Sequence, residues 1–148
     1  MSIPAPSVAL DDQLCFALYS ASRAVTARYR PMLDQLGLTY PQFLVLMTLW
    51  EHDDQNVREI SDRLDLDSGT MSPLLKRLDA AGLVTRERSA ADERQVRVRL
   101  TDAGRALEQP ACRVSAMMID ALDLDVQQFA ALKRQLEEIT ERVGGGTR

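Results

Sequence analysis

The stretch from Leu66 to Gly82 reads Leu-Asp-Ser-Gly-Thr-Met-Ser-Pro-Leu-Leu-Lys-Arg-Leu-Asp-Ala-Ala-Gly and predicts a short amphipathic helix. Its large apolar residues recur at i, i+3, i+4 and i+7, which is the spacing of one buried stripe. Asp67 or Ser68 is suited to cap the start of this helix, and Gly82 is suited to end it. Hydroxyl and basic side chains lie off the stripe, so the free face of the helix is expected to be polar and basic. The residues of the stripe are Met71, Leu74, Leu75 and Leu78.

A second short helix is expected immediately before this one. Asn56 is placed to cap residues 57–64, and Glu59 stands at the position that completes a capping box. A turn over residues 65–67 then leads into the helix that follows. Two short helices joined by a tight turn, the second basic on its free face, predict a helix-turn-helix.

Two further segments predict a β-hairpin after Gly82. Residues 83–86 are suited to a first strand, and residues 95–100 alternate strictly between apolar and polar side chains. The residues between them, 87–94, are polar and offer no apolar anchor. A helix-turn-helix followed by a hairpin with a charged tip predicts a winged helix.

The tip of this hairpin is expected to reach a DNA groove. Arg94 is the candidate probe, because a narrow minor groove concentrates negative potential and attracts guanidinium groups. Asp92 is expected to orient Arg94 through a charge-assisted hydrogen bond.

Other candidate DNA contacts lie on the Leu66–Gly82 helix and on the first strand. Residues expected to face base edges or phosphates are Ser68, Thr70, Ser72 and Arg77. Residues expected to contact phosphates, which position a protein without specifying sequence, are Lys76, Arg86 and Arg88. Two copies related by two-fold symmetry would read an inverted repeat with half-sites about one helical turn apart.

The rest of the chain is expected to be helical. Asp11 and Asp12 are suited to cap a first helix, and Thr39–Gln42 forms a capping box before a buried helix. Thr101 and Asp102 begin another helix, which Pro110 is expected to kink. A last helix opens at Asp123 and Asp125, with an apolar stripe formed by Phe129, Leu132, Leu136 and Ile139.

These elements predict a mainly α-helical fold with a small β-hairpin wing, contained in a single domain of 148 residues. The winged helix occupies about residues 40–100. Residues 9–37 and 102–143 carry more apolar surface than the wing lobe covers, and are expected to form a helical dimerisation region.

Charge and cysteine content narrow the possible partners and the compartment. The net charge of −4 argues against a protein that coats nucleic acid or anionic membranes over its whole surface. Residues 57–100 hold nine Lys/Arg against eight Asp/Glu, whereas the rest of the chain holds nine against fourteen. Two cysteines, no recognisable signal peptide and no apolar run that spans a membrane predict a cytoplasmic protein with free thiols.

Several separated motifs resemble known families. Residues 57–107 resemble the DNA-binding lobe of MarR-type winged-helix repressors, notably through residues 75–84 and 92–94. Residues 13–19, Tyr29, and residues 38–42 and 64–70 are similar to the organic-hydroperoxide-sensing, OhrR-like branch. The resemblance implies a homodimeric repressor that releases its operator when an organic hydroperoxide oxidises a cysteine.

Cys15 is the cysteine that the resemblance assigns to sensing. A thiol between Leu14 and Phe16 otherwise suggests a small buried hydrophobic residue. The resemblance implies that Tyr19 and Tyr29 donate hydrogen bonds to the Cys15 thiolate across the dimer interface. The alternative for both tyrosines is interface packing.

Cys112 departs from the two-cysteine members of this branch, in which a resolving thiol lies near the position of Asp120. Cys112 is therefore interpreted as buried or incidental. Oxidised Cys15 would then form a mixed disulfide with a low-molecular-weight thiol, such as bacillithiol, coenzyme A or glutathione.

Two other functions remain open. A MarR-type repressor could bind a phenolic ligand in its dimer pocket with Cys15 structural, and a thiol peroxidase could turn over hydroperoxide. The sequence has no phosphate-binding loop, nucleophile elbow or dinucleotide-binding turn, and His52 has no second histidine beside it. No enzyme activity, cofactor or metal is expected.

Overall fold

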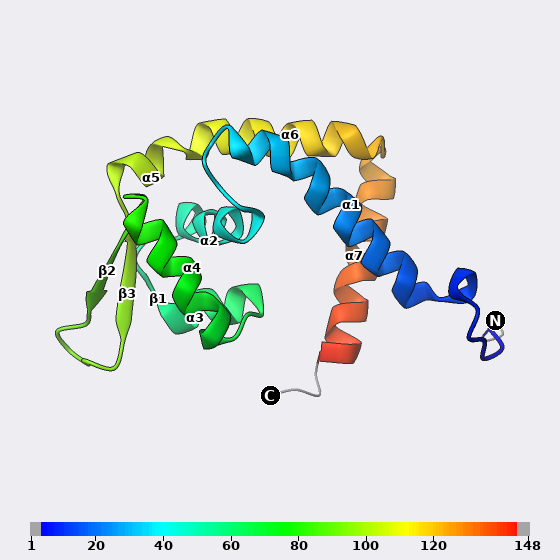
Figure 1. Cartoon of the computed structure of the whole chain (residues 1–148), viewed down its shortest axis with the longest axis horizontal. Helices are drawn as coiled ribbons and strands as arrows, with labels where there is room; N and C mark the ends of the chain where they lie inside the picture. The colour runs from blue at the N-terminus through cyan, green and yellow to red at the C-terminus, as the bar shows by residue number, and fades with distance from the viewer. Residues whose placement is uncertain (1–3, 145–148) are drawn as a thin grey trace. The chain divides into compact units, whose positions relative to one another are not determined.

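Residues 4–144 are described by a computed structural model, and the chain divides into two units, Met1–Val114 and Ser115–Arg148. Helix α6, Glu108–Leu122, belongs to both units. The first unit holds the predicted winged helix (Figure 1).

Helices α2 (Tyr40–Glu51), α3 (Val57–Leu64) and α4 (Ser68–Ala80) form the helical part of the winged helix. Both predicted capping boxes are confirmed. The Thr39 hydroxyl and the Asn56 amide oxygen each accept a hydrogen bond from the third backbone N–H of their helix. Gly82, with φ +74°, ends the turn after α4, in a conformation that glycine adopts without steric cost.

The core of the first unit lies beneath α2 and α4. All four residues of the predicted α4 stripe are buried there, together with Leu33 of the first helix and Val98 of the sheet. The side chains of α2 are buried on most sides, as its continuous apolar run predicted.

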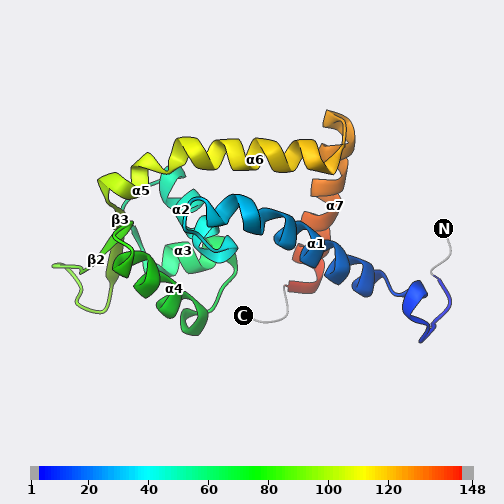
Figure 2. The same cartoon turned by 45° about the horizontal axis from the view of Figure 1, so that its top comes forward.

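The wing is a three-stranded antiparallel sheet in the order β1-β3-β2. Strands β2 (Val84–Arg88) and β3 (Val96–Leu100) pair with Thr85 opposite Arg99, and thus confirm the predicted hairpin. Strand β1, Gln55–Asn56, pairs with the other edge of β3 and was not predicted. Figure 2 shows the hairpin beside α3 and α4. The wing and α4, the helix expected to read DNA and called the reading helix below, therefore belong to one lobe.

Helix α1 covers Leu14–Asp34 and follows a short 3-10 turn, Leu10–Asp12. The prediction that Asp11 and Asp12 cap this helix is wrong. Both residues lie in the 3-10 turn, and Gln13 occupies the N-cap position without a side-chain cap bond.

The helix predicted to begin at Thr101 and Asp102 is interrupted before Pro110. Helix α5 (Asp102–Ala106), capped by Thr101, ends at Ala106 with Leu107 as its C-cap, and α6 begins at Glu108 with Pro110 in its first turn. Pro110 lacks the N–H that would bond to the Ala106 carbonyl, so the helix divides upstream of the proline.

The second unit contains the end of α6 and α7, Val126–Gly144. Asp125 and Gln128 form a reciprocal capping box at the start of α7. The predicted opening of the last helix at Asp125 is thus confirmed. Helix α7 has no buried residue, and Leu132 and Leu136 of its predicted stripe are exposed. Within residues 4–144, no helix has the length and hydropathy to cross a membrane.

Candidate nucleic-acid interface and thiol site

The free face of α4 carries the predicted DNA contacts. The side chains of five residues on this face are exposed: Ser68, Thr70, Ser72, Lys76 and Arg77. Asp67 caps the helix by accepting a 2.7 Å hydrogen bond from the Thr70 N–H, and this bond lowers the pKa of Asp67. The helix therefore begins with hydroxyl groups and bears its two cations further along the same exposed surface.

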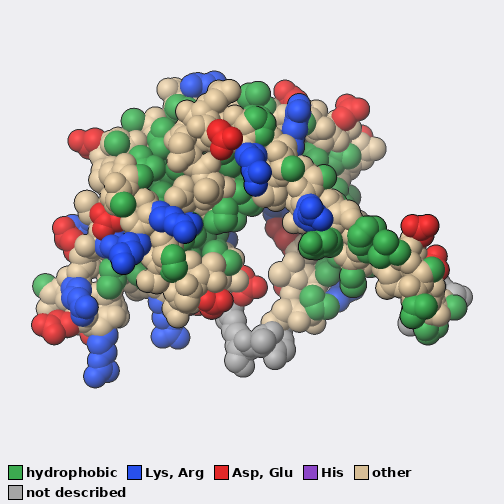
Figure 3. Space-filling view, viewed as in Figure 1, with side chains coloured by type: hydrophobic (Ala, Val, Ile, Leu, Met, Phe, Trp, Pro, Cys, Tyr) green, Lys and Arg blue, Asp and Glu red, His purple; other side chains and the backbone are tan. Residues whose placement is uncertain are grey.

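An open groove of about 620 Å³ runs between α3, the start of α4 and the end of the hairpin. It brings Ser68 together with Asp92 and Arg94, which are far away in the sequence. Arg58, an exposed residue of α3, also lines the groove and was not singled out by the sequence motifs. Figure 3 shows Lys and Arg side chains on this lobe, interspersed with Asp and Glu.

Two hydrogen bonds between side chains and the main chain hold the hairpin tip. The Asp92 carboxylate accepts a 3.0 Å hydrogen bond from the backbone N–H of Arg94, and Arg88 donates to the Glu93 carbonyl at 3.3 Å. The expected bond from Asp92 to the Arg94 guanidinium is thus replaced by a bond to the main chain. Asp92 shapes the turn, and the Arg94 side chain extends from it exposed.

Arg86 was expected to be an exposed phosphate contact, but its side chain is paired within the protein. Its guanidinium donates a 2.9 Å hydrogen bond to Asp79 of α4, and its side chain is 30% exposed. Arg86 therefore joins the reading helix to strand β2.

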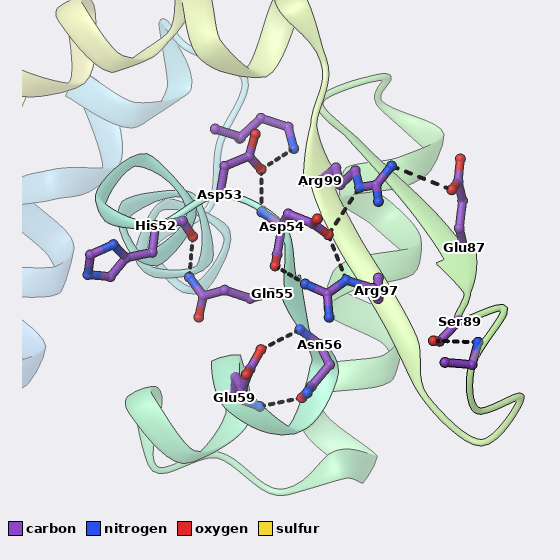
Figure 4. A network of polar contacts seen from close by, with 12 residues as sticks. His52, Asp53, Asp54, Gln55, Asn56, Glu59, Glu87, Ser89, Arg97 and Arg99 are labelled. Atoms are coloured by element: carbon purple, nitrogen blue, oxygen red, sulfur yellow. Dashed lines mark hydrogen bonds and ion pairs between the residues drawn. The ribbon is translucent and has the colours of Figure 1, made fainter.

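The turn between α2 and β1 carries two aspartates that bind arginine side chains from other elements. Figure 4 shows Arg97 and Arg99 of β3 converging on Asp54, whose carboxylate accepts from their Nε atoms at 2.7 and 3.0 Å. Asp54 adopts a left-handed conformation, φ 59°. Asp53 accepts from the Leu100 N–H at 2.9 Å and from Arg105 at 2.6 Å. These contacts attach the sheet to α2.

The Asp54 contacts predict a stability difference that depends on pH. Hydrogen bonds from Arg97 and Arg99 lower the pKa of Asp54, so its contribution is present at neutral pH and is lost as pH falls through the folded-state pKa. We expect Asp54→Asn to melt below the wild type at pH 7 and the gap between the two melting temperatures to be smaller at pH 3. Thermal melts across this range measure the difference, and an equal gap at both pH values would contradict the ionic role.

Arg94 is predicted to contribute to DNA affinity through its charge. Arg94→Ala should weaken binding about tenfold and reduce the slope of log K against log salt by about one. Fluorescence anisotropy at several salt concentrations measures both quantities. Arg113→Ala removes the same charge from α6 and should leave both unchanged. Unaltered affinity in Arg94→Ala would remove this residue from the interface.

Cys15 is exposed in the first turn of α1, so it is not part of the hydrophobic core of its own chain. Its neighbours Leu14 and Phe16 are also exposed, at 66% and 41%. Tyr19 stands one turn further along on the same helix face and is 59% exposed. The Arg23 guanidinium lies 5.5 Å from the centroid of the Tyr19 ring. The thiol thus shares an open surface with a phenol and a cation.

Tyr29 lies fourteen residues beyond Cys15 on the same helix, about 21 Å along its axis at the usual rise. The two residues therefore do not meet within one chain. Tyr29 packs instead against Tyr40, with ring centroids 5.0 Å apart, and against Phe43 at 6.0 Å.

The Tyr29–Tyr40 pair is suited to donate hydrogen bonds. Burial raises the pKa of both phenols, and Tyr40 adds a smaller upward effect on Tyr29, so both stay protonated at neutral pH. Tyr40 was not predicted as a site residue. The available signal was its place in residues 38–42, which form a capping box and are similar to the OhrR-like branch.

Cys112 is exposed on α6, so it is not buried within its own chain, and the alternative that this thiol is incidental stays a prediction. His52 forms the C-cap of α2, and its side chain is exposed. Within residues 4–144, no cluster of three His, Cys, Asp or Glu side chains is arranged to hold a metal ion.

Comparisons with known proteins agree with this geometry. A family model described as transcriptional regulator SarA/Rot matches residues 27–109. The chain is 42% identical over 132 residues to the organic hydroperoxide resistance transcriptional regulator of Bacillus subtilis, covering 89% of this chain and 90% of that protein.

Solved structures of AbfR, a protein of Staphylococcus epidermidis, are also similar. Reduced AbfR bound to DNA aligns with a TM-score of 0.81 and 37% identity, covering 92% of this chain and 93% of that one. Disulfide-containing AbfR aligns with a TM-score of 0.67 and 39% identity, over 89% and 93% of the two chains.

Proposed function

The chain belongs to the SarA/Rot and MarR-type winged-helix transcriptional regulators, and we propose that it is a repressor that senses organic hydroperoxides through Cys15. The observation that carries the proposal is the position of this thiol. Cys15 is exposed near the start of α1, beside Tyr19, and a similar regulator acts in organic hydroperoxide resistance. A reactive cysteine has to be accessible to its oxidant.

The chemistry begins with the Cys15 thiolate. Its sulfur attacks the terminal oxygen of the hydroperoxide, the O–O bond breaks, and an S–O bond forms. The alkoxide leaves and takes a proton from water, so the hydroperoxide is reduced to an alcohol and Cys15 is oxidised to a sulfenic acid. Leu14 and Phe16, the neighbours of Cys15 in the sequence, are apolar and exposed, and this surface suits an alkyl hydroperoxide.

A second copy of the chain supplies the remaining part of the site. Exposed apolar residues on α1 and α6, including Leu14, Phe16 and Met117, require a covering surface, as expected of a homodimer. Because Tyr29 lies too far from Cys15 along the same helix, the phenols of the Tyr29–Tyr40 pair would reach the thiolate from the partner. A two-fold dimer would read an inverted repeat in double-stranded DNA.

Oxidation would then change the spacing of the two reading helices. A free-energy difference of about 3 kcal/mol between the two dimer states lowers DNA affinity more than a hundredfold. The test begins with a duplex selected from random sequence by the reduced protein. Cumene hydroperoxide should release this duplex, and dithiothreitol should restore binding.

The same assay distinguishes the alternatives. Release by a phenolic acid such as salicylate, with no response to hydroperoxide, would replace the proposal with a ligand-binding repressor. Continuous consumption of hydroperoxide in the presence of a thiol reductant would favour a thiol peroxidase.

Cys112 is predicted not to be needed for the response. We expect the Cys15 sulfenic acid to condense with a low-molecular-weight thiol, forming a mixed disulfide and water. Cys112→Ser should therefore release DNA as the wild type does, and mass spectrometry should find the thiol adduct on Cys15. A disulfide-linked dimer on a non-reducing gel, present in the wild type and absent from Cys112→Ser, would instead identify Cys112 as the resolving thiol.

A further inference from the structure

Four aromatic rings form a continuous contact series from α1 to the end of α2. Tyr29 contacts Tyr40 and Phe43, Tyr40 lies 6.3 Å from Phe43, and Phe43 lies 6.3 Å from Trp50 in an edge-on arrangement. Phe43, at the centre, is 1% exposed. Because buried rings are closely packed, Phe43 cannot accommodate a shift of the tyrosines without affecting Trp50.

Trp50, at the far end of this series, is bonded to the base of the wing. Its indole N–H donates a 3.0 Å hydrogen bond to the carbonyl of Gly104 in α5. Gly104 is buried, and a Cβ placed on it would lie 2.1 Å from the Leu83 carbonyl oxygen. Trp50 therefore holds α5 at a point where α5 touches the main chain of Leu83.

Leu83 is the residue at which the DNA-reading elements meet. It follows the turn after α4 and directly precedes β2, and its N–H donates to the Leu78 carbonyl at 3.0 Å. Its own carbonyl accepts a 3.0 Å hydrogen bond from the N–H of Thr101, the residue after β3. A displacement of Gly104 would thus reach the reading helix and both strands of the hairpin.

We propose that Trp50 is a positioning residue that transmits a change at the Tyr29–Tyr40 pair to the junction of α4 and the wing. The inference rests on the proposed function. When Cys15 is oxidised, the phenols lose the thiolate as a hydrogen-bond acceptor and must move away from a larger group. The rings carry this shift to the indole, and the bond to Gly104 converts it into a change in the angle between reading helix and hairpin.

The indole N–H is the decisive group in this arrangement. Trp50→Phe retains an aromatic ring against Phe43 and removes the donor to Gly104. Wild-type DNA affinity is expected to fall more than about a hundredfold on oxidation. In Trp50→Phe the same ratio should fall below about tenfold, while the affinity of the reduced form stays within about threefold of the wild type.

Arg105→Gln is the matched control. Arg105 also connects α5 to the turn after α2, through a hydrogen bond to Asp53, and is separate from the Trp50–Gly104 hydrogen bond. Its loss should leave the ratio of oxidised to reduced dissociation constants as in the wild type. An equal reduction of the ratio in Arg105→Gln and Trp50→Phe would overturn the inference, because any weakened link between these elements would then suffice.

Trp50 is also the only tryptophan of the sequence, so its fluorescence reports on the ring itself. In the wild type, cumene hydroperoxide should change the emission at the rate of DNA release. Release without any change in emission, or a wild-type ratio in Trp50→Phe, would overturn the inference and leave hydroperoxide sensing intact. A wild type that keeps its DNA after oxidation would overturn the sensing proposal together with this inference.

Discussion

Cys15→Ser is expected to bind DNA as tightly as the reduced wild type and to remain bound after hydroperoxide is added. Under the same conditions the wild type should lose more than about a hundredfold in affinity, equivalent to about 3 kcal/mol. Serine has nearly the shape of cysteine, and its hydroxyl does not form the sulfenic acid that starts the response. Fluorescence anisotropy with the selected duplex, before and after cumene hydroperoxide, measures both states.

Stability separates loss of sensing from loss of folding in this variant. Cys15 lies outside the hydrophobic core of its own chain and serine is nearly isosteric with it, so the substitution should change the free energy of unfolding by no more than about 0.5 kcal/mol. Cys112→Ser is the control for general thiol reactivity and should release DNA normally. If Cys15→Ser released DNA to the same extent as the wild type, Cys15 would not be the sensor.

Gly104→Ala is expected to cause the largest loss of stability. The added methyl group would lie 2.1 Å from the Leu83 carbonyl oxygen, and a main-chain atom does not move away as a flexible side chain does. Leu100 Cδ2 at 3.2 Å limits movement on another side. We expect the free energy of unfolding to fall by about 3 kcal/mol, the upper part of the usual range for an overpacked core.

Urea titration followed by circular dichroism measures this loss, and Gly144→Ala provides the control. Gly144 lies at the end of α7, and nothing lies within 4 Å of a Cβ built on it. That variant should unfold at the wild-type urea concentration or slightly above it, because alanine favours helix more than glycine does. An unchanged midpoint in Gly104→Ala would show that α5 can move away from Leu83 at little cost.

Sequence reasoning was most successful where the signal is local. The capping boxes at Thr39 and Asn56 and the buried stripe of α4 each depend on residues within about two helical turns. Strand β1 has only two residues, and its partner Val98 lies more than forty positions away. No alternation can develop over two residues, so that strand had no signal in the sequence.

The charged residues show the opposite case. Arg86, Arg94 and Arg97 look alike in a basic hairpin, yet Arg86 binds Asp79, Arg97 binds Asp54, and Arg94 extends from the tip. Which arginine faces DNA depends on which carboxylate the fold brings near it. The spacing of charges along a strand does not contain that information.

The sequence by itself determined the winged helix, because helix caps, apolar periodicity and strand alternation act between near neighbours in the chain. The pattern of side chains also indicated the polar face of α4, and the resemblance to the OhrR-like branch indicated Cys15. Only the tertiary structure decided that Cys15 is exposed, that Tyr29 pairs with Tyr40, and that Trp50 bonds to Gly104 at the base of the wing. Those contacts join residues distant in the sequence, and packing of the whole core selects them.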